Sequence, residues 1–233
     1  MEWQDDAILL NMRPQGEHAG LVTLFTPTHG KWLGRLSGAQ SAKRRSWLTA
    51  GNSVQASWAA RLEEQLGGFN LELTEPRAAR VFDDPQRLLA LSYLAALTDQ
   101  TVTERLPLPL LYYSFETACE AVAGEADVKR VVVDYERTLL ETLGYGLDMT
   151  SCAVTGVRED LTHISPNTGR AVSRAAAAPY ADRLLALPAY WLTGAAPDAA
   201  ELARAARVTA YFLQLHLFPS PRKLPDARWD VLK

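Results

Sequence analysis

The sequence predicts an α+β fold in which a small five-stranded β-barrel precedes a mostly α-helical region. Residues 1 to about 78 contain five short runs rich in Val, Ile, Leu, Thr, Phe and Trp, separated by Gly, Pro, Asn or His. No helical period occurs between these runs, which favours a closed barrel over a βαβ unit. From residue 84 onward, apolar residues recur at helical spacing. We therefore place a domain boundary between residues 79 and 80.

The five predicted strands lie in runs where apolar and polar residues tend to alternate. In chain order, these runs are AILLNMRP, AGLVTLFTPTHG, KWLGRLSG, NSVQASWAARL and FNLELTEP. Together they predict a barrel domain over residues 1–79, followed by a helical domain over residues 80–233.

Capping residues mark the ends of the predicted helices. Asp84 is a suitable N-cap for the first helix, and the second helix is expected to end near Gly124. The third helix is expected to start at Asp127 and to stop at Gly144 to Gly146. Two further helices are predicted in APYADRLLALPAYWLTG and DAAELARAARVTAYFLQLHLF.

The composition is typical of a soluble globular protein. The chain has 233 residues, of which 48% are hydrophobic and 22% charged, and its net charge is −3. Because the whole chain is not a polycation, any nucleic-acid role must come from local charge. The two cysteines do not suggest a disulfide framework, and Cys119 is expected to be a buried thiol. Neither a signal peptide nor a membrane span is recognisable, so we expect a cytoplasmic protein without a membrane partner.

The strongest functional signal is a stretch that lacks carboxylates. No Asp or Glu occurs between Glu17 and Glu63. The cations in this interval are Lys31, Arg35, Lys43, Arg44, Arg45 and Arg61, interleaved with Trp32, Trp47 and Trp58. Such cations release counterions from a phosphate backbone, and exposed aromatic rings stack on unpaired bases. The alternative is a solvated basic loop with tryptophans in the barrel core. Trp58 is expected in that core, and both readings remain open for Trp32 and Trp47.

The sequence offers no catalytic constellation. It contains no GxxxxGK[ST] phosphate loop, no GxSxG elbow and no HExxH helix. The histidines are scattered without metal-ligand spacing and are expected in turns or on the surface: His18, His29, His163 and His216. We therefore expect neither an enzyme nor a cofactor.

The order of several motifs resembles RecO, a family of bacterial recombination mediators. A predicted strand is followed by Thr26-x-x-x-Gly30, by a second strand and by the glycine-rich basic loop. Further along, LGYGLD ends a helix and precedes a Cys and SPNTGRAVS, and the tail reads LQLHLFPSPRKLPDARW. Each motif is weak by itself, so the resemblance rests on their order over nearly the whole chain.

This resemblance implies an oligonucleotide-binding (OB) fold followed by a helical domain. It also implies binding of single- and double-stranded DNA and annealing of complementary strands in a nucleoid-associated protein. The implied partners are RecR and single-strand binding protein, with RecA loaded indirectly at gaps. Carried onto this chain, the DNA-contacting candidates are Lys31, Arg35, Lys43, Arg44, Arg45 and Arg61.

Two further surfaces follow from the same resemblance. A second basic patch is expected at Arg222, Lys223 and Arg228. The acidic, hydrophobic-ended C-terminal tail of single-strand binding protein would suit an apolar groove rimmed by cations. The helix over residues 127–143 offers Lys129, Arg130 and Arg137 for that rim, although these cations could equally form a solvated helix face.

The chain departs from the family at the zinc site that many RecO proteins build from four cysteines. Cys152 stands at the first of these positions, but Thr155, Ser173 and Ala176 occupy the others. A structural zinc ion needs about four Cys or His ligands, so we expect no metal. Residues 148–178 should then form a degenerate zinc-finger-like insertion, with a reversal at Asn167 to Gly169.

The sequence leaves three hypotheses for function. The first is a non-catalytic DNA repair and recombination mediator that holds strands by their phosphates. The second is a helical protein-interaction scaffold whose barrel does not bind DNA. The third is an enzyme with an unrecognised site, which the missing motifs disfavour.

Overall fold

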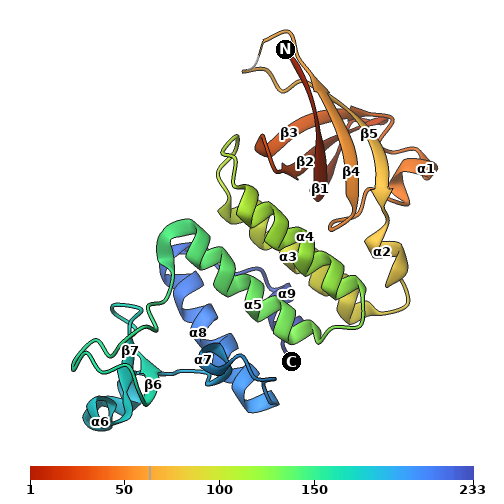
Figure 1. Cartoon of the computed structure of the whole chain (residues 1–233). Coiled ribbons are helices and arrows are strands. Elements are labelled where there is room, and N and C mark those ends of the chain that lie inside the picture. Colours follow the sequence, from red (N-terminus) through yellow and green to blue (C-terminus); the bar gives the residue numbers. More distant parts are fainter. Residues whose placement is uncertain (63) are drawn as a thin grey trace. The chain divides into compact units, whose positions relative to one another are not determined.

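The computed structural model describes residues 1–62 and 64–233 (Figure 1). These residues form two compact units. Unit 1 spans Met1–Val128, Pro225–Val231 and Lys233, and unit 2 spans Lys129–Leu224 and Leu232. The change from strands to helices near residue 80 lies inside unit 1. The predicted domain boundary between residues 79 and 80 marks the change from strands to helices, and it stays a prediction.

Five strands form a closed barrel in unit 1. They are β1 (Glu2–Gln15), β2 (Ala19–Thr26), β3 (Gly30–Ser37), β4 (Ser53–Ala59) and β5 (Gly68–Glu75). Their order around the barrel is β1-β2-β3-β5-β4, with β4 pairing back to β1. The neighbouring strands are antiparallel except β3 and β5, whose short parallel pairing joins Arg35 to Gly68 and Leu36 to Phe69. The predicted fold class, a five-stranded β-domain followed by helices, is confirmed.

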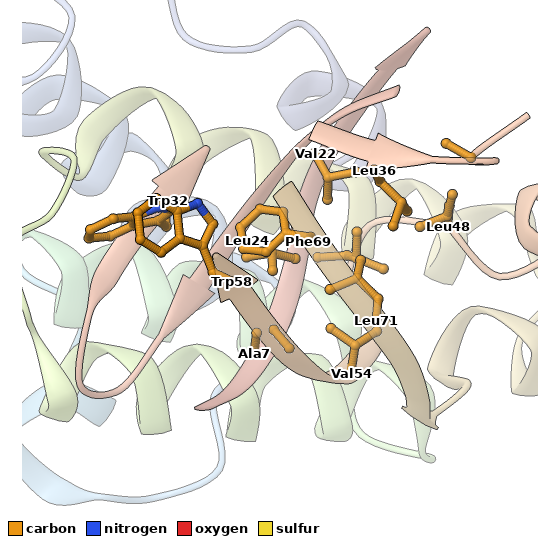
Figure 2. Close-up of a cluster of buried hydrophobic side chains, with 13 residues drawn as sticks. Ala7, Val22, Leu24, Trp32, Leu36, Leu48, Val54, Trp58, Phe69 and Leu71 are labelled. Carbon is orange, nitrogen blue, oxygen red and sulfur yellow. The ribbon is translucent and has the colours of Figure 1, made fainter. Parts of the chain in front are cut away.

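Alternation along the strands fills the barrel with apolar side chains. The buried cluster comprises Ala7, Leu9, Val22, Leu24, Trp32, Leu36, Ala39, Leu48, Val54, Ala56, Trp58, Phe69 and Leu71. Figure 2 shows these side chains converging from several strands. In β1, the register shifts between Leu9 and Asn11, which leaves one extra residue between them. Such a bulge bends a strand, so β1 pairs with β4 along its first half and with β2 along its second.

Helices complete unit 1. They are α1 (Ala42–Arg45), α2 (Arg77–Arg80), α3 (Pro85–Thr101), α4 (Pro109–Ala123) and α9 (Ala227–Val231). The predicted cap is confirmed, since the Asp84 carboxylate accepts a hydrogen bond from the Arg87 N–H at 3.1 Å. Figure 1 shows α3 and α4 side by side, and they pack against β1 and β2 respectively. Cys119 on α4 is buried as predicted, and burial raises its thiol pKa to about 12.

A buried guanidinium ties the barrel to α4. Arg77 is 4% exposed and donates hydrogen bonds to the Gly51 carbonyl at 3.1 Å and the Ser53 hydroxyl at 2.6 Å. Its Nε also donates to the Glu120 carboxylate at 2.9 Å. Desolvation raises the pKa of Glu120, but hydrogen bonds from Arg80 and Arg77 outweigh it and hold that pKa below its usual value. The barrel and α4 therefore share one set of charge-assisted hydrogen bonds.

We predict that Arg77→Met lowers the free energy of unfolding by about 2 kcal/mol, mainly because it leaves the buried acceptors at Gly51 and Ser53 without a donor. The ion pair with Glu120 adds less, because that carboxylate is half exposed. The matched control is Arg80→Met, which removes the other cation on Glu120 from an exposed position. The control should cost less than about 1 kcal/mol. Urea unfolding measures both values, and equal losses would contradict the assigned role of Arg77.

Unit 2 consists of two long helices and the short elements between them. The long helices are α5 (Val128–Leu140, whose first residue belongs to unit 1) and α8 (Ala199–His216). The short elements are the π-turn η1 (Glu141–Tyr145), β6 (Leu161–Ile164), β7 (Ala171–Ser173), α6 (Arg174–Ala177), the 3₁₀ turn η2 (Ala178–Arg183), β8 (Leu185–Ala186) and α7 (Tyr190–Thr193). The sheet order is β7-β6-β8. The predicted reversal is present between β6 and β7, where Gly169 has a φ of +67° and its N–H bonds the Ser165 carbonyl.

The prediction of one helix over APYADRLLALPAYWLTG was wrong. The segment forms η2, then β8, and then the short helix α7. Pro188 cannot continue a helix that began before it, and the preceding backbone finds its partners in a sheet. Ala186 pairs with His163, and Leu185 pairs with Ile164. Tertiary pairing therefore overrides the helical spacing of the leucines.

Buried side chains hold unit 2 together. Val133, Tyr190, Leu202 and Ala205 form one apolar cluster.

Among residues 1–62 and 64–233, no helix has both the length and the apolar character needed to cross a membrane.

Candidate nucleic-acid interface

Two arginines share the outer face of the barrel where β1, β2 and β3 lie side by side. Arg13 on β1 pairs with Leu21 on β2, and Leu21 pairs with Arg35 on β3. Both arginines are exposed, and they stand two strands apart, about 10 Å from backbone to backbone. Sequence reasoning missed Arg13 because it precedes the carboxylate-free interval, and only the strand register aligns it with Arg35.

The three consecutive cations form one helical turn on the connection between β3 and β4. Ser41 caps α1 by accepting a hydrogen bond from the Arg44 N–H at 3.4 Å. Lys43 and Arg45 are exposed, whereas the Arg44 guanidinium donates to the Ser37 carbonyl at the end of β3. Within the described part of the chain, these three cations form no ion pair with a carboxylate. Their charge is therefore presented outward.

Neighbouring contacts hold α1 firmly on the barrel. Leu48, which follows α1, is buried in the barrel core, and Trp47 packs against the same cluster. The Gln40 side chain donates to the carbonyls of Gly16 and Ala19, at the turn between β1 and β2. The basic turn is thereby fixed beside the end of β1 that carries Arg13.

Arg61 lies on the connection between β4 and β5 and is exposed. Gly67 ends that connection, and its carbonyl accepts a hydrogen bond from the Arg35 N–H at 3.1 Å. Gly67 has a φ of +61°, and a Cβ there would lie 2.3 Å from Trp58 Nε1. Only glycine therefore lets the connection approach both Trp58 and β3.

Lys31 is engaged inside unit 1. Its Nζ donates to the Asp99 carbonyl at 2.5 Å and lies 3.7 Å from the Asp99 carboxylate on α3. Its side chain is only 11% exposed. The ammonium therefore joins the barrel to α3, unlike the other predicted DNA-contacting cations.

The tryptophans of the barrel contribute to its core. Trp58 is 2% exposed, as predicted for a core residue, and Trp32 is also buried. Trp3, which sequence reasoning did not single out, stacks on His29 at 4.3 Å between ring centroids. The rings of Trp3, Trp32 and Trp58 thus pack on one another in the barrel.

A buried carboxylate fixes the turn between β2 and β3. Asp5 accepts hydrogen bonds from the Thr28 hydroxyl at 2.6 Å and the Thr28 N–H at 3.2 Å, and His29 Nδ1 lies 3.0 Å away. Burial raises the pKa of Asp5, but the hydrogen bonds from Thr28 and His29 outweigh it, so the pKa lies below its usual value. His29 is therefore a turn residue, as expected.

The second basic patch needs a correction. Arg228 is 1% exposed, so it lies in the interior and cannot join an exposed patch. Its neighbour Leu224 is also buried, and that tail is folded into the protein instead of extending from it. Arg222 and Lys223 are exposed in the turn that follows α8.

The α5 cations make specific contacts within unit 2. Arg130 lies 3.4 Å from the Asp134 carboxylate, and the Arg137 guanidinium lies 5.5 Å from the Trp191 ring centroid. Tyr190 donates to the other oxygen of Asp134 at 3.0 Å. Arg137 and Trp191 therefore place a cation beside an aromatic surface.

The insertion is held by hydrogen bonds around Cys152. Its buried Sγ accepts a hydrogen bond from the Ser173 N–H at 3.3 Å. Burial raises the pKa of this thiol, but hydrogen bonds from Ser173 and Thr155 outweigh it and lower the pKa to about 6. In the residues that the structure describes, no three His, Cys, Asp or Glu side chains gather as metal ligands would.

A five-stranded barrel in this order, with cations on its β1–β3 face and helices after it, defines an OB-fold protein with a helical extension. Family models agree with both parts: "Recombination protein O N terminal" matches residues 1–77, and "Recombination protein O C terminal" matches residues 83–225. The chain belongs to the RecO family.

Similar proteins cover almost the whole chain. One from Rhodospirillum centenum is 46% identical over 220 residues, covering 94% of this chain and 88% of that protein. Another from Sinorhizobium medicae is 40% identical over 229 residues, covering 97% and 91%. A third from Phenylobacterium zucineum is 40% identical over 234 residues, covering 100% and 96%. All three are named DNA repair protein RecO.

We predict that Gly67→Ala destabilises the barrel by about 2 to 4 kcal/mol, because it combines left-handed backbone strain with a clash against Trp58. Gly16→Ala is the matched control, since Gly16 has a φ of +63° and open space around it. The control should cost about 1 kcal/mol. Thermal or urea unfolding measures the difference, and equal costs would show that Trp58 does not restrict this connection.

Proposed function

We propose that this protein is a non-catalytic DNA repair and recombination mediator. It binds single- and double-stranded DNA through α1 and the β1–β3 face, and it anneals complementary strands. It helps load RecA, together with RecR, at gaps coated by single-strand binding protein, in the cytoplasm at the nucleoid. Membership of the RecO family, whose relatives are named DNA repair proteins, supports the biological role.

The observation that carries the proposal is the segregation of charge on the barrel. The basic side carries Arg13, Arg35 and the α1 cations Lys43, Arg44 and Arg45. The strands of the other face, β4, β5 and the half of β1 paired with β4, contain no Lys or Arg. Only the side of the barrel that carries these cations is therefore suited to binding phosphates.

The acidic face is unsuited to phosphates. It exposes Glu2, Asp6 and Glu72. A hollow of about 550 Å³ here is lined by polar side chains and by aromatic rings: Glu2, Trp3, Gln4, Ser57, Trp58, Ala59, Gly68, Phe69 and Asn70. The hollow lacks the cations that a phosphate requires, so its size alone does not make it the DNA site.

The net charge of −3 does not oppose binding on the basic side. Charges in water interact over about 8 Å at physiological ionic strength, because salt screens them beyond that distance. A phosphate beside α1 is therefore governed by Lys43, Arg44, Arg45 and their neighbours, more than by acids elsewhere. This local attraction should weaken steeply as salt is added.

The buried tryptophans favour a mechanism that leaves bases free. Because Trp32 and Trp58 fill the barrel core, the basic side offers cations for phosphates and few rings for bases. A strand held by its backbone keeps its base edges available to a complementary strand. Annealing by this route needs no nucleotide hydrolysis.

Partner binding is assigned to unit 2 in this proposal. The acidic C-terminal tail of single-strand binding protein has the chemistry for a cationic rim beside an apolar surface. Arg137 beside Trp191 supplies such a combination, and Lys129 and Arg130 extend the rim along α5. RecR is the second expected protein partner.

We predict that the triple variant Lys43→Ala/Arg44→Ala/Arg45→Ala flattens the salt dependence of single-strand binding. Each lost phosphate contact should reduce the slope of log K against log salt by about 0.7, so the total change is about 2. Fluorescence anisotropy of a labelled oligonucleotide measures this slope. The matched control is Arg158→Ala/Arg174→Ala/Arg183→Ala, which removes three exposed cations of unit 2.

Annealing of complementary oligonucleotides, with and without single-strand binding protein, completes this test. The α1 variant should anneal more slowly than the control variant. An unchanged slope and annealing rate would contradict the proposed site. If the wild-type protein itself does not bind DNA, the result would favour the protein-interaction scaffold.

We predict opposite behaviour for two cations on the same strand. Arg35→Ala should reduce the salt slope by about 0.7 and leave stability within about 0.5 kcal/mol. Lys31→Ala should leave the slope unchanged but lower the free energy of unfolding by about 1 to 2 kcal/mol, because it removes the contact with Asp99. A reduced slope for Lys31→Ala would mean that this ammonium leaves Asp99 to bind DNA.

A further inference from the structure

A second interval without carboxylates lies in unit 2. No Asp or Glu occurs between Glu201 and Asp226. This interval contains Arg204, Arg207, Arg222 and Lys223, and all four are exposed. It therefore repeats the feature that distinguishes the basic side of the barrel.

Helix α8 sorts its residues between an inner and an outer face. Its buried residues are Leu202, Ala205, Val208, Thr209, Phe212 and Leu213. Arg204, Arg207, Tyr211 and Leu215 are exposed and follow one another at spacings of three and four residues. That spacing aligns them in one stripe along the helix. Among the residues that the structure describes, neither Arg204 nor Arg207 forms an ion pair with a carboxylate.

The turn after α8 brings two more cations to the same end of the helix. The Gln214 side chain donates to the carbonyls of Phe218 and Arg222, the latter at 3.0 Å. The Arg222 guanidinium lies 5.1 Å from the Phe218 ring centroid. These contacts fold the turn back against α8, so Arg222 and Lys223 lie near the end of the stripe.

One exposed aromatic ring belongs to the stripe, and another lies on a neighbouring face of α8 at its C-terminal end. Tyr211 is 38% exposed, and its ring meets Phe212 edge-on at 5.2 Å between centroids. Tyr145 is 40% exposed and stacks on His216 at 4.4 Å. Unlike the tryptophans of the barrel, these tyrosine rings keep much of their surface open to a ligand.

We infer that this α8 surface (Arg204, Arg207, Tyr211, Leu215, Arg222 and Lys223) is a second contact surface for single-stranded DNA. The cations pair with phosphates, and Tyr211 stacks on a base. This inference rests on the proposed function and adds that bases, and not only phosphates, are contacted in unit 2. Annealing would then use two strand-contacting surfaces on one chain.

Charge, rings and length all fit that ligand. Four cations without a carboxylate in the interval suit a repeating polyanion, and exposed aromatic rings stack on bases whatever their sequence. From Arg204 to Leu215 the stripe is about 16 Å long. That length matches roughly four or five stacked nucleotides at about 3.4 Å each.

The test compares Arg204→Ala/Arg207→Ala with Arg158→Ala/Arg183→Ala in the full chain. Both double variants remove two exposed arginines of unit 2, so their net charges are equal. The α8 variant should reduce the salt slope of single-strand binding by about 1.4, whereas the control should not. Circular dichroism verifies that both variants stay folded.

Tyr211 gives an independent measurement. Tyr211→Ala should weaken oligonucleotide binding about tenfold through lost stacking, and Tyr211→Phe should retain wild-type affinity. Annealing by the α8 variant and by Tyr211→Ala should be slower than by the control. If the α8 variant and Tyr211→Ala behave like the control, the inference is overturned.

Two other results separate this inference from the proposed barrel site. If the α1 triple variant keeps its salt slope while the α8 variant loses part of it, the barrel site fails and the α8 surface stands. If the α8 variant binds DNA normally but no longer binds an acidic peptide with a hydrophobic end, the surface belongs to a protein partner and the inference is overturned.

Discussion

Closure of the barrel depends on one short contact between strands, the parallel pairing of β3 with β5, called the seam below. Only Arg35–Gly68 and Leu36–Phe69 join these strands, yet the pairing closes the barrel. Small residues make the approach feasible: a Cβ at Gly34 would lie 2.6 Å from the Phe69 ring. The seam also holds the Arg35 backbone against the connection that carries Arg61. Barrel closure and the placement of Arg35 therefore depend on the same contact.

The exposed cations of the barrel domain gather on one side, and this is the side suited to a polyanion. A mildly acidic protein binds a polyanion when its cations share one surface and screening weakens the influence of distant carboxylates. Here Arg13 and Arg35 are aligned by strand register, and α1 is anchored by Leu48 in the core and by Gln40 on the first turn. Packing thus fixes the geometry of the cations, while their side chains remain in solvent.

Much of the fold could be predicted because local signals agreed with tertiary structure. Alternating runs became the five strands, and Asp84 capped its helix. The prediction failed where distant pairing decided the outcome, as at β8, where Ala186 joins β6. The sequence also does not reveal that Lys31 contacts Asp99 or that Arg228 is buried. Nor does the sequence single out Arg13, because only the strand register aligns it with Arg35, two strands away.

The central claim is that DNA contacts the cations of α1 while Lys31 stays bound to Asp99. Acetylation of lysine amines, mapped by mass spectrometry with and without a saturating single-stranded oligonucleotide, tests it directly. The account predicts that Lys43 reacts readily in the free protein and is protected by DNA, whereas Lys31 reacts slowly in both states. Equal reaction of Lys43 with and without DNA, or protection of Lys31 alone, would contradict it.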